Sequence, residues 1–250
     1  MLAFHITLNE FRRIWIQPLV WAVLGITFII IALLFLTLLN NFYHDMQNKF
    51  SGIASAPGVT DAVFYPMLFW STIIGALMMP IITLRTVTEE KIRRQDTLLT
   101  CAAIPCHTII YSKLMAIISV AFAFGFLNLI FPATISAMTN LDWGKIYAAM
   151  LGMLLFQISF ASVCLWIATL THNIMFIMLS SLGTLFLSFI LFFSATSEGS
   201  ISALFLYLSG FSHLLNFLSG LVTSKGILFF IITTLFFVSL STIHLRYKRD

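Results

Sequence analysis

The sequence predicts an all-α integral membrane protein with six transmembrane helices, on the basis of composition, hydropathy and the length of its apolar runs. Of the 250 residues, 60% are hydrophobic and only 9% are charged, whereas an average soluble domain carries about 25% charged residues. The mean hydropathy of the chain is +1.03. A helix crosses the bilayer core with about 20 consecutive apolar residues, and six runs of this sequence reach that length.

The six apolar runs define the order of the spans. They cover residues 18–39, 63–84, 109–138, 146–170, 174–195 and 226–245. The third run is longer than a bilayer requires, so we expect it to tilt or to begin with an interfacial turn. The connection over residues 40–62 is polar and holds Gly52, Pro57 and Gly58, so we expect it to be irregular.

Residues 1–17 are expected to form a separate helix that lies in the membrane interface. Four apolar residues recur at helical spacing on one face, namely Phe4, Leu8, Phe11 and Trp15. Such a face is typical of an interfacial helix, and the chain then turns into the first span at Pro18, since proline suits the first helical position. The alternative is a cytoplasmic extension of the first span. Because Arg12 and Arg13 precede a run long enough to span, we expect no cleaved signal peptide.

The segment over residues 196–225 is apolar, yet small and polar residues interrupt it. We expect a helical segment that re-enters the outer leaflet before the sixth span and packs on protein, because irregular backbone at that depth needs protein partners. A seventh span is the alternative, and it would put the basic C-terminal tail on the opposite side of the membrane. The candidate outer-gate residues in this segment are Ser209, Gly210, His213, Asn216 and Gly220.

Lysine and arginine residues predict the orientation of the chain, since short cytoplasmic loops carry an excess of them. With six spans and a cytoplasmic N-terminus, both termini and ten of the 13 basic residues lie on the cytoplasmic side. The three basic residues left outside are Lys49, Lys145 and Lys225. An odd number of spans would separate the two basic termini. The turn at residues 171–173 is then cytoplasmic, although it contains no lysine or arginine.

Charge is concentrated between the second and third spans. Eight of the 22 lysine, arginine, aspartate and glutamate residues fall in the 29 residues 85–113. We expect a helix over residues 86–100 that is capped by Thr88, with Glu89 and Glu90 in the first turn, where carboxylates suit the positive end of the helix dipole. The arginines four positions later complete favourable pairs. This segment is either a surface helix that only fixes topology or a docking helix for a soluble partner.

Catalytic motifs are scarce in this sequence. The stretch EEKIRR, from Glu89 to Arg94, fits the EExxxR pattern of intramembrane CAAX-processing proteases, but the FxxxH pattern of those enzymes is absent. There is no GxSxG nucleophile elbow and no Walker A phosphate-binding loop. Three cysteines without CxxC spacing indicate neither a disulfide framework nor a metal site. We therefore expect a chain that is not an enzyme and binds no metal or ATP itself.

The predicted spans carry mild polar groups rather than buried carboxylates. Proton- or sodium-driven carriers need ionisable residues or broken helices inside the bilayer, and a charged-ring channel needs charged side chains along its pore. The composition of the spans disfavours both classes, so the energy for any transport is expected to come from another protein. Asn128 and Gln157 are the candidate polar residues of a pore.

Several stretches resemble ABC-2-type ABC transporter permeases, in particular the small six-span permeases of the gliding-motility and nitrous-oxide-reductase-maturation types. The stretch LMMPIITLRTVTEEK, residues 77–91, followed by DTLLTCAAIP, is similar to the end of their second span and their coupling helix. NEFRRIWIQPLVW resembles their opening through Glu10 and Pro18, and Lys113 matches a lysine at the mouth of their third span. HLLNFLSGLVTSKGILFF resembles their ending.

The resemblance implies one ABC-2-type transmembrane domain over residues 1–250, in the inner membrane of a bacterium, that exports an unidentified substrate. Its parts are the interfacial helix (1–17), spans 1–2 (18–84), the cytoplasmic coupling segment (85–108), spans 3–5 (109–195), the outer re-entrant segment (196–225), and span 6 with the basic tail (226–250). Asp96 and Leu99 depart from the glycine and the glutamate usual in the family. The residues implied to couple the chain to an ATPase are Arg85, Thr88, Glu89, Glu90, Lys91, Arg93, Arg94, Thr97, Leu98 and Leu99.

The partners implied by the resemblance are an ABC ATPase subunit in two copies, which binds ATP and magnesium, and a second permease chain, identical or related. Membrane lipid is the remaining expected partner, and nucleic acid is not expected. A second class of function is a non-transporting membrane anchor that recruits a cytoplasmic complex. Such an anchor needs the same docking helix but no ATP turnover stimulated by a substrate.

Overall fold

The computed structural model of the chain describes residues 2–48, 58–92, 105–137, 139–171, 173–195 and 207–247. Within these ranges every regular element is a helix, in agreement with the predicted fold class. The elements are α1 (Leu2–Ile16), α2 (Pro18–Asn48), the π-helix η1 (Thr60–Phe64), α3 (Tyr65–Ile92), α5 (Cys106–Ile135), α6 (Trp143–Leu170), α7 (Ile174–Ala195), α9 (Gly210–Leu218) and α10 (Ser224–Tyr247).

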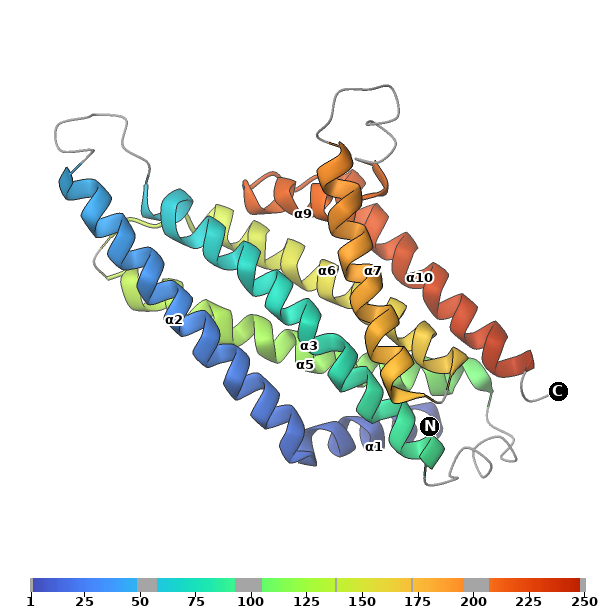
Figure 1. The fold of residues 1–250 in the computed structure, drawn as a ribbon. Coiled ribbons are helices and arrows are strands. Elements are labelled where there is room, and N and C mark those ends of the chain that lie inside the picture. The colour runs from blue at the N-terminus through green and yellow to red at the C-terminus, as the bar shows by residue number, and fades with distance from the viewer. Residues whose placement is uncertain are drawn as a thin grey trace.

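Six of the described helices are long and apolar enough to cross a membrane, and they correspond in order to the six predicted runs. These are α2, η1 with α3, α5, α6, α7 and α10. They alternate in direction, so that α1, the end of α3 and the end of α10 lie toward one end of the bundle, together with both termini (Figure 1). The end of α2, the start of α3 and α9 lie toward the other end (Figure 1).

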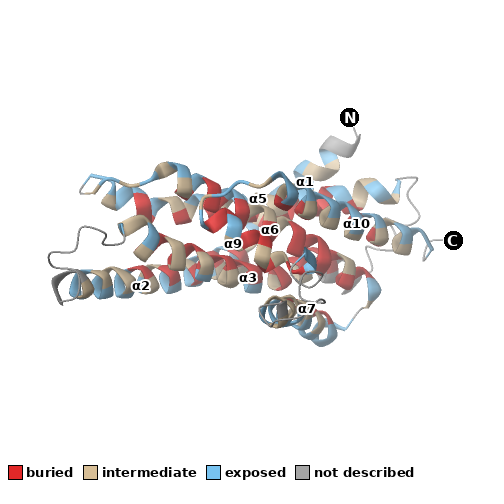
Figure 2. Ribbon diagram, turned by 90° about the horizontal axis from the view of Figure 1, so that it is seen from above, coloured by how far each residue is buried: buried red, intermediate tan, exposed pale blue. Residues whose placement is uncertain are grey.

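Helix α6 is the centre of the bundle, because it packs against α3, α10, α9 and α5. Its buried residues include many small side chains, such as Gly152, Ala161 and Ala168, which allow close approach of neighbouring helices. Buried residues gather along α3 and α6, whereas α7 is exposed over most of its surface (Figure 2). Exposed apolar residues on α2, α7 and α10 form surfaces of the kind that face lipid in a membrane protein.

The N-terminal helix is separate from the first span, so the alternative of one continuous helix is wrong. Gln17 interrupts the helix between α1 and α2, and α1 packs mainly against α5. Leu8 and Phe11 on the predicted apolar face are exposed, while Ile14 is buried against the bundle. The described part of the predicted apolar face is therefore divided: Leu8 and Phe11 are exposed, whereas Trp15 packs against the bundle.

Two boundaries differ from the sequence prediction. The connection over residues 40–62 is helical at both of its described ends, because α2 continues to Asn48 and η1 begins at Thr60. The predicted start of the helix over residues 86–100, with Thr88 as its cap, is also wrong. Helix α3 runs without interruption from Tyr65 to Ile92, since no glycine or proline follows Pro80 within it, and Thr88 therefore lies inside a helix rather than at a cap.

The described part of the predicted outer segment contains a short helix and not a seventh span. Helix α9 has 9 residues, too few to cross a bilayer core of about 30 Å at 1.5 Å per residue. It lies across the end of the bundle (Figure 1) and packs against α6 and α7. A turn follows, in which Gly220 has φ +88°, a conformation that favours glycine.

Candidate functional site

A buried lysine lies where α3 ends and α5 begins. Lys113 is in the third turn of α5, and its side chain is 5% exposed. The Nζ atom donates a hydrogen bond of 2.9 Å to the backbone carbonyl of Thr86 in α3. A helix carbonyl has a second lone pair and can accept this bond in addition to the bond within its own helix. Lys113 therefore fixes the end of the second span to the start of the third.

The same lysine is paired with the N-terminal helix. Its Nζ lies 3.8 Å from Oε1 of Glu10 on α1, and the Glu10 side chain is 13% exposed. Glu10, Thr86 and Lys113, the Lys113 network, thus connect α1, α3 and α5. A buried charge is tolerated when it is paired and hydrogen-bonded, so these two contacts explain how the lysine can be buried among three helices.

One member of this network has a signal in the sequence. Lys113 falls within the third apolar run, residues 109–138, although the predicted orientation places it among the cytoplasmic basic residues. An ionisable residue inside a span is a functional candidate by default, and that rule identifies Lys113. The partner Glu10 carries no such signal, because only the packing of α1 on α5 brings it near Lys113.

The predicted coupling residues lie next to the network, as far as they are described. Arg85 is half-buried in α3, one residue before Thr86. Thr88, Glu89, Glu90 and Lys91 belong to the last turns of α3. The remaining predicted coupling residues, Arg93, Arg94, Thr97, Leu98 and Leu99, lie outside the described residues.

The two candidate pore residues, Asn128 of α5 and Gln157 of α6, are both fully buried. Asn128 donates from Nδ2 to the carbonyl of Phe124, 2.9 Å away. Gln157 packs against Gly75 so closely that an added Cβ there would overlap its amide. Neither amide atom of Gln157 has a hydrogen-bond partner, nor does Oδ1 of Asn128. Buried amides without partners are costly in an apolar interior, so the hydrogen bonds of these two side chains do not account for their burial.

Replacing Gln157 with methionine is expected to raise the free energy of unfolding by about 1–3 kcal/mol, because it removes a buried amide without partners and nearly conserves volume. Thermal unfolding of the purified chain in detergent measures the change. Asn128→Leu is the comparison, and its gain should be smaller because it also removes the hydrogen bond to Phe124. A loss of stability in Gln157→Met would show that the amide has a partner in the membrane.

The candidate outer-gate residues lie in and around α9. Ser209 is fully buried, and its Oγ donates to the carbonyl of Ser188 in α7 at 3.4 Å. His213 is buried, with Nε2 3.2 Å from the carbonyl of Tyr207 and its ring 4.6 Å from that of Phe229. Gly210 begins the helix, Asn216 is exposed on it, and Gly220 forms the following turn. His213 is thus a hydrogen-bonded packing residue.

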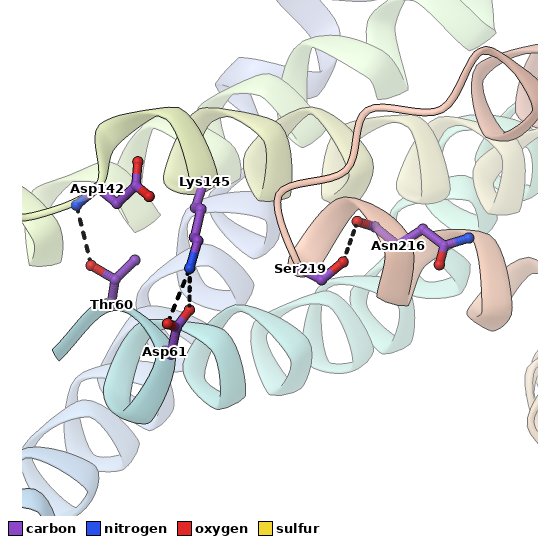
Figure 3. A network of polar contacts seen from close by, with 6 residues as sticks. All are labelled: Thr60, Asp61, Asp142, Lys145, Asn216 and Ser219. Carbon is purple, nitrogen blue, oxygen red and sulfur yellow. Dashed lines mark hydrogen bonds and ion pairs between the residues drawn. The ribbon is translucent and has the colours of Figure 1, made fainter. Parts of the chain in front are cut away.

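A polar network closes the end of the bundle beside α9. Lys145 at the start of α6 lies 2.9 Å from Oδ1 of Asp61 in η1, and the backbone amide of Asp142 donates to Oγ1 of Thr60 (Figure 3). Gly220 packs against the Lys145 side chain, where an added Cβ would lie 2.8 Å from Cγ. These contacts join the beginnings of the second and fourth spans to the turn after α9.

The described ranges hold no group of three or more His, Cys, Asp and Glu side chains that could bind a metal ion. No protein-family model matches the chain, and no curated protein matches it. The function is therefore argued from the Lys113 network, the buried amides and the charged segment.

Proposed function

We propose that this chain is the membrane-spanning permease subunit of an ABC exporter in a bacterial inner membrane, powered by a separate ATPase. The Lys113 network is the observation that carries the proposal. Within the charged segment, residues 85–113, α3 ends at Ile92 and α5 begins at Cys106. The two helices that flank it are joined by the bond from Lys113 to Thr86, and Glu10 adds α1 to the same unit.

This arrangement suits the transmission of force from a soluble partner. A force that the ATPase exerts on the coupling segment, residues 85–108, would act on α3 and α5 together, because Lys113 bonds one helix to the other. Both helices pack on α6, and the contacts between α3, α5 and α6 include the unpartnered amide of Gln157. A change in the spacing of α3 and α5 would therefore reach the buried amides directly. Two such chains, with two ATPase chains, would form the complete transporter.

Charge reversal in the proposed docking segment, residues 85–108, is expected to abolish co-purification of the ATPase. Glu89→Lys together with Arg94→Glu keeps the net charge while it inverts the pattern that the partner reads. Affinity capture of the full chain from membranes of its own organism, followed by mass spectrometry, measures the bound ATPase. The doubly substituted chain should still insert into the membrane.

The matched control is the same exchange at the opposite end of the bundle, Asp61→Lys with Lys145→Asp, which should leave ATPase capture unchanged. If the Glu89 and Arg94 exchange retains the ATPase in full, the docking assignment is wrong. Reconstitution of both subunits then separates the permease from an anchor. A permease should show ATP hydrolysis that a substrate stimulates, whereas a non-transporting anchor should bind the ATPase without this stimulation.

A further inference from the structure

An apolar groove lies between α2 and α5, beside the junction of α1 and α2. It encloses about 470 Å³ and is lined by one face of each helix. Gly25 forms part of its wall, and a Cβ added there would meet no atom within 4 Å. Phe126 and Ile130 line it and are exposed, so the groove opens to the surface of the bundle between two helices that are apolar enough to span a membrane.

Two tryptophans line this groove near the start of α2. The rings of Trp15 and Trp21 lie edge to face, with centroids 5.3 Å apart. Trp15 donates from Nε1 to Oγ of Ser119 on α5 at 3.1 Å, and Trp21 donates from Nε1 to the carbonyl of Trp15 at 2.8 Å. Tryptophan is enriched at the level of lipid headgroups because its ring is apolar and its N–H is polar. The chemistry of the pair therefore suits lipid headgroups at this end of the groove.

A basic side chain lies next to that end. Arg12 is exposed on α1 and precedes Trp15 by three positions. Residues at this spacing have Cβ atoms about 5–6 Å apart, so Arg12 and Trp15 lie on the same side of α1. Guanidinium groups match the geometry of phosphate oxygens.

We infer that this groove binds an anionic phospholipid, with one acyl chain between α2 and α5 and the phosphate at Arg12. The apolar lining suits an acyl chain, the tryptophan pair suits the glycerol and headgroup level, and the positive charge selects an anionic headgroup. The lipid would connect α1 to the first span at the same end of the bundle as the Lys113 network. This inference does not depend on the proposed transport function.

Fluorescence quenching by brominated lipids tests the inference, because bromine on an acyl chain quenches a tryptophan that it contacts. Trp70, Trp143 and Trp166 are replaced by phenylalanine, so that Trp15 and Trp21 report. The full chain is placed in phosphatidylcholine vesicles that contain a minor fraction of dibromo-phosphatidylglycerol or dibromo-phosphatidylcholine. Dibromo-phosphatidylglycerol should reach half-maximal quenching at a mole fraction about fivefold lower than dibromo-phosphatidylcholine does. This difference is the effect of one basic residue near the headgroups.

Two variants and a matched control complete the test. Arg12→Gln should remove the preference for phosphatidylglycerol, and Gly25→Phe should fill the groove and reduce quenching by both lipids. Gly183→Phe is the control, since Gly183 on α7 also has open space at its Cβ, and it should leave quenching unchanged. Equal quenching by the two lipids in the parent, or an unchanged preference in Arg12→Gln, would overturn the inference. Weak quenching by both lipids together with a dimer in sedimentation would assign the groove to a second copy of the chain.

Discussion

Replacing Lys113 with methionine is expected to lower the free energy of unfolding by about 3 kcal/mol, the lower end of the range for breaking a buried ion pair. The lower end applies because the pair is 3.8 Å long, beyond hydrogen-bond distance. The loss arises because Glu10 loses the opposite charge beside it and because the buried hydrogen bond from Lys113 to the Thr86 carbonyl is removed. Denaturant unfolding of the purified chain in detergent measures it.

The double variant Lys113→Met with Glu10→Leu should recover most of that stability, because apolar residues replace both members of the pair. Lys145→Met is the matched control at the other end of the bundle. Its pair with Asp61 is shorter, 2.9 Å, but its side chains are 37% and 57% exposed, and exposed pairs contribute little. We would abandon the Lys113 network as a structural tie if Lys113→Met and Lys145→Met destabilised the chain equally.

Loss of Lys113 should also weaken coupling beyond its effect on stability. The double variant Lys113→Met with Glu10→Leu should restore the stability of the fold but not the hydrogen bond to Thr86, so α3 and α5 should no longer move as one unit. If the chain is the proposed permease, ATP hydrolysis by the reconstituted complex should then respond less to substrate, although the double variant should be nearly as stable as the parent. This outcome separates a role in force transmission from a role in folding alone.

Replacing Phe217 with alanine is expected to cost about 3–5 kcal/mol, the range for emptying a buried phenylalanine site. Phe217 is 0% exposed and fits between two glycines, Gly152 of α6 and Gly226 of α10. An added Cβ would overlap its side chain at Gly152 and lie 2.7 Å from its Cε2 at Gly226. Phe217 therefore holds α9 on the bundle. Thermal unfolding measures the loss of stability, and labelling of a cysteine that replaces the buried Leu214 measures the release of α9 from the bundle.

Two further variants make the Phe217 result specific to α9. Gly152→Ala should also destabilise, by about 1–3 kcal/mol through overpacking, because the overlap falls on Cβ and Cγ of Phe217, near the α9 backbone. Phe186→Ala on α7 is the control, since Phe186 is exposed and its removal opens no cavity. If the cysteine at position 214 stayed unlabelled in the Phe217→Ala variant, α9 would be held by other contacts.

The order and number of the long helices were predictable from the sequence because the hydropathy of a run is a local property. Each of the six runs contains enough apolar residues to specify a helix of membrane length, whatever its neighbours are. The helix at the N-terminus was predictable for a similar reason, since the spacing of Leu8, Phe11 and Trp15 indicates one face.

Helix boundaries were less predictable where several residues offered competing signals. The Thr88 cap followed by two glutamates indicated a new helix, yet α3 continues through it. A favourable N-cap contributes only about 1 kcal/mol, so this local signal does not by itself end a helix that has already formed upstream.

The contacts between distant segments were decided only by the tertiary structure. Hydropathy specifies which residues enter the bundle but not which helices touch, and so it could not pair Glu10 with Lys113 or place Gln157 against Gly75. These pairs depend on the packing of α1 on α5 and of α6 on α3, which brings together residues far apart in the chain. The sequence by itself determined six helices and a concentration of charge between two of them. The packing determined that Lys113 of α5 contacts α3 and α1, the helix before the charged segment and the N-terminal helix. A buried lysine needs such partners because its own helix does not supply them.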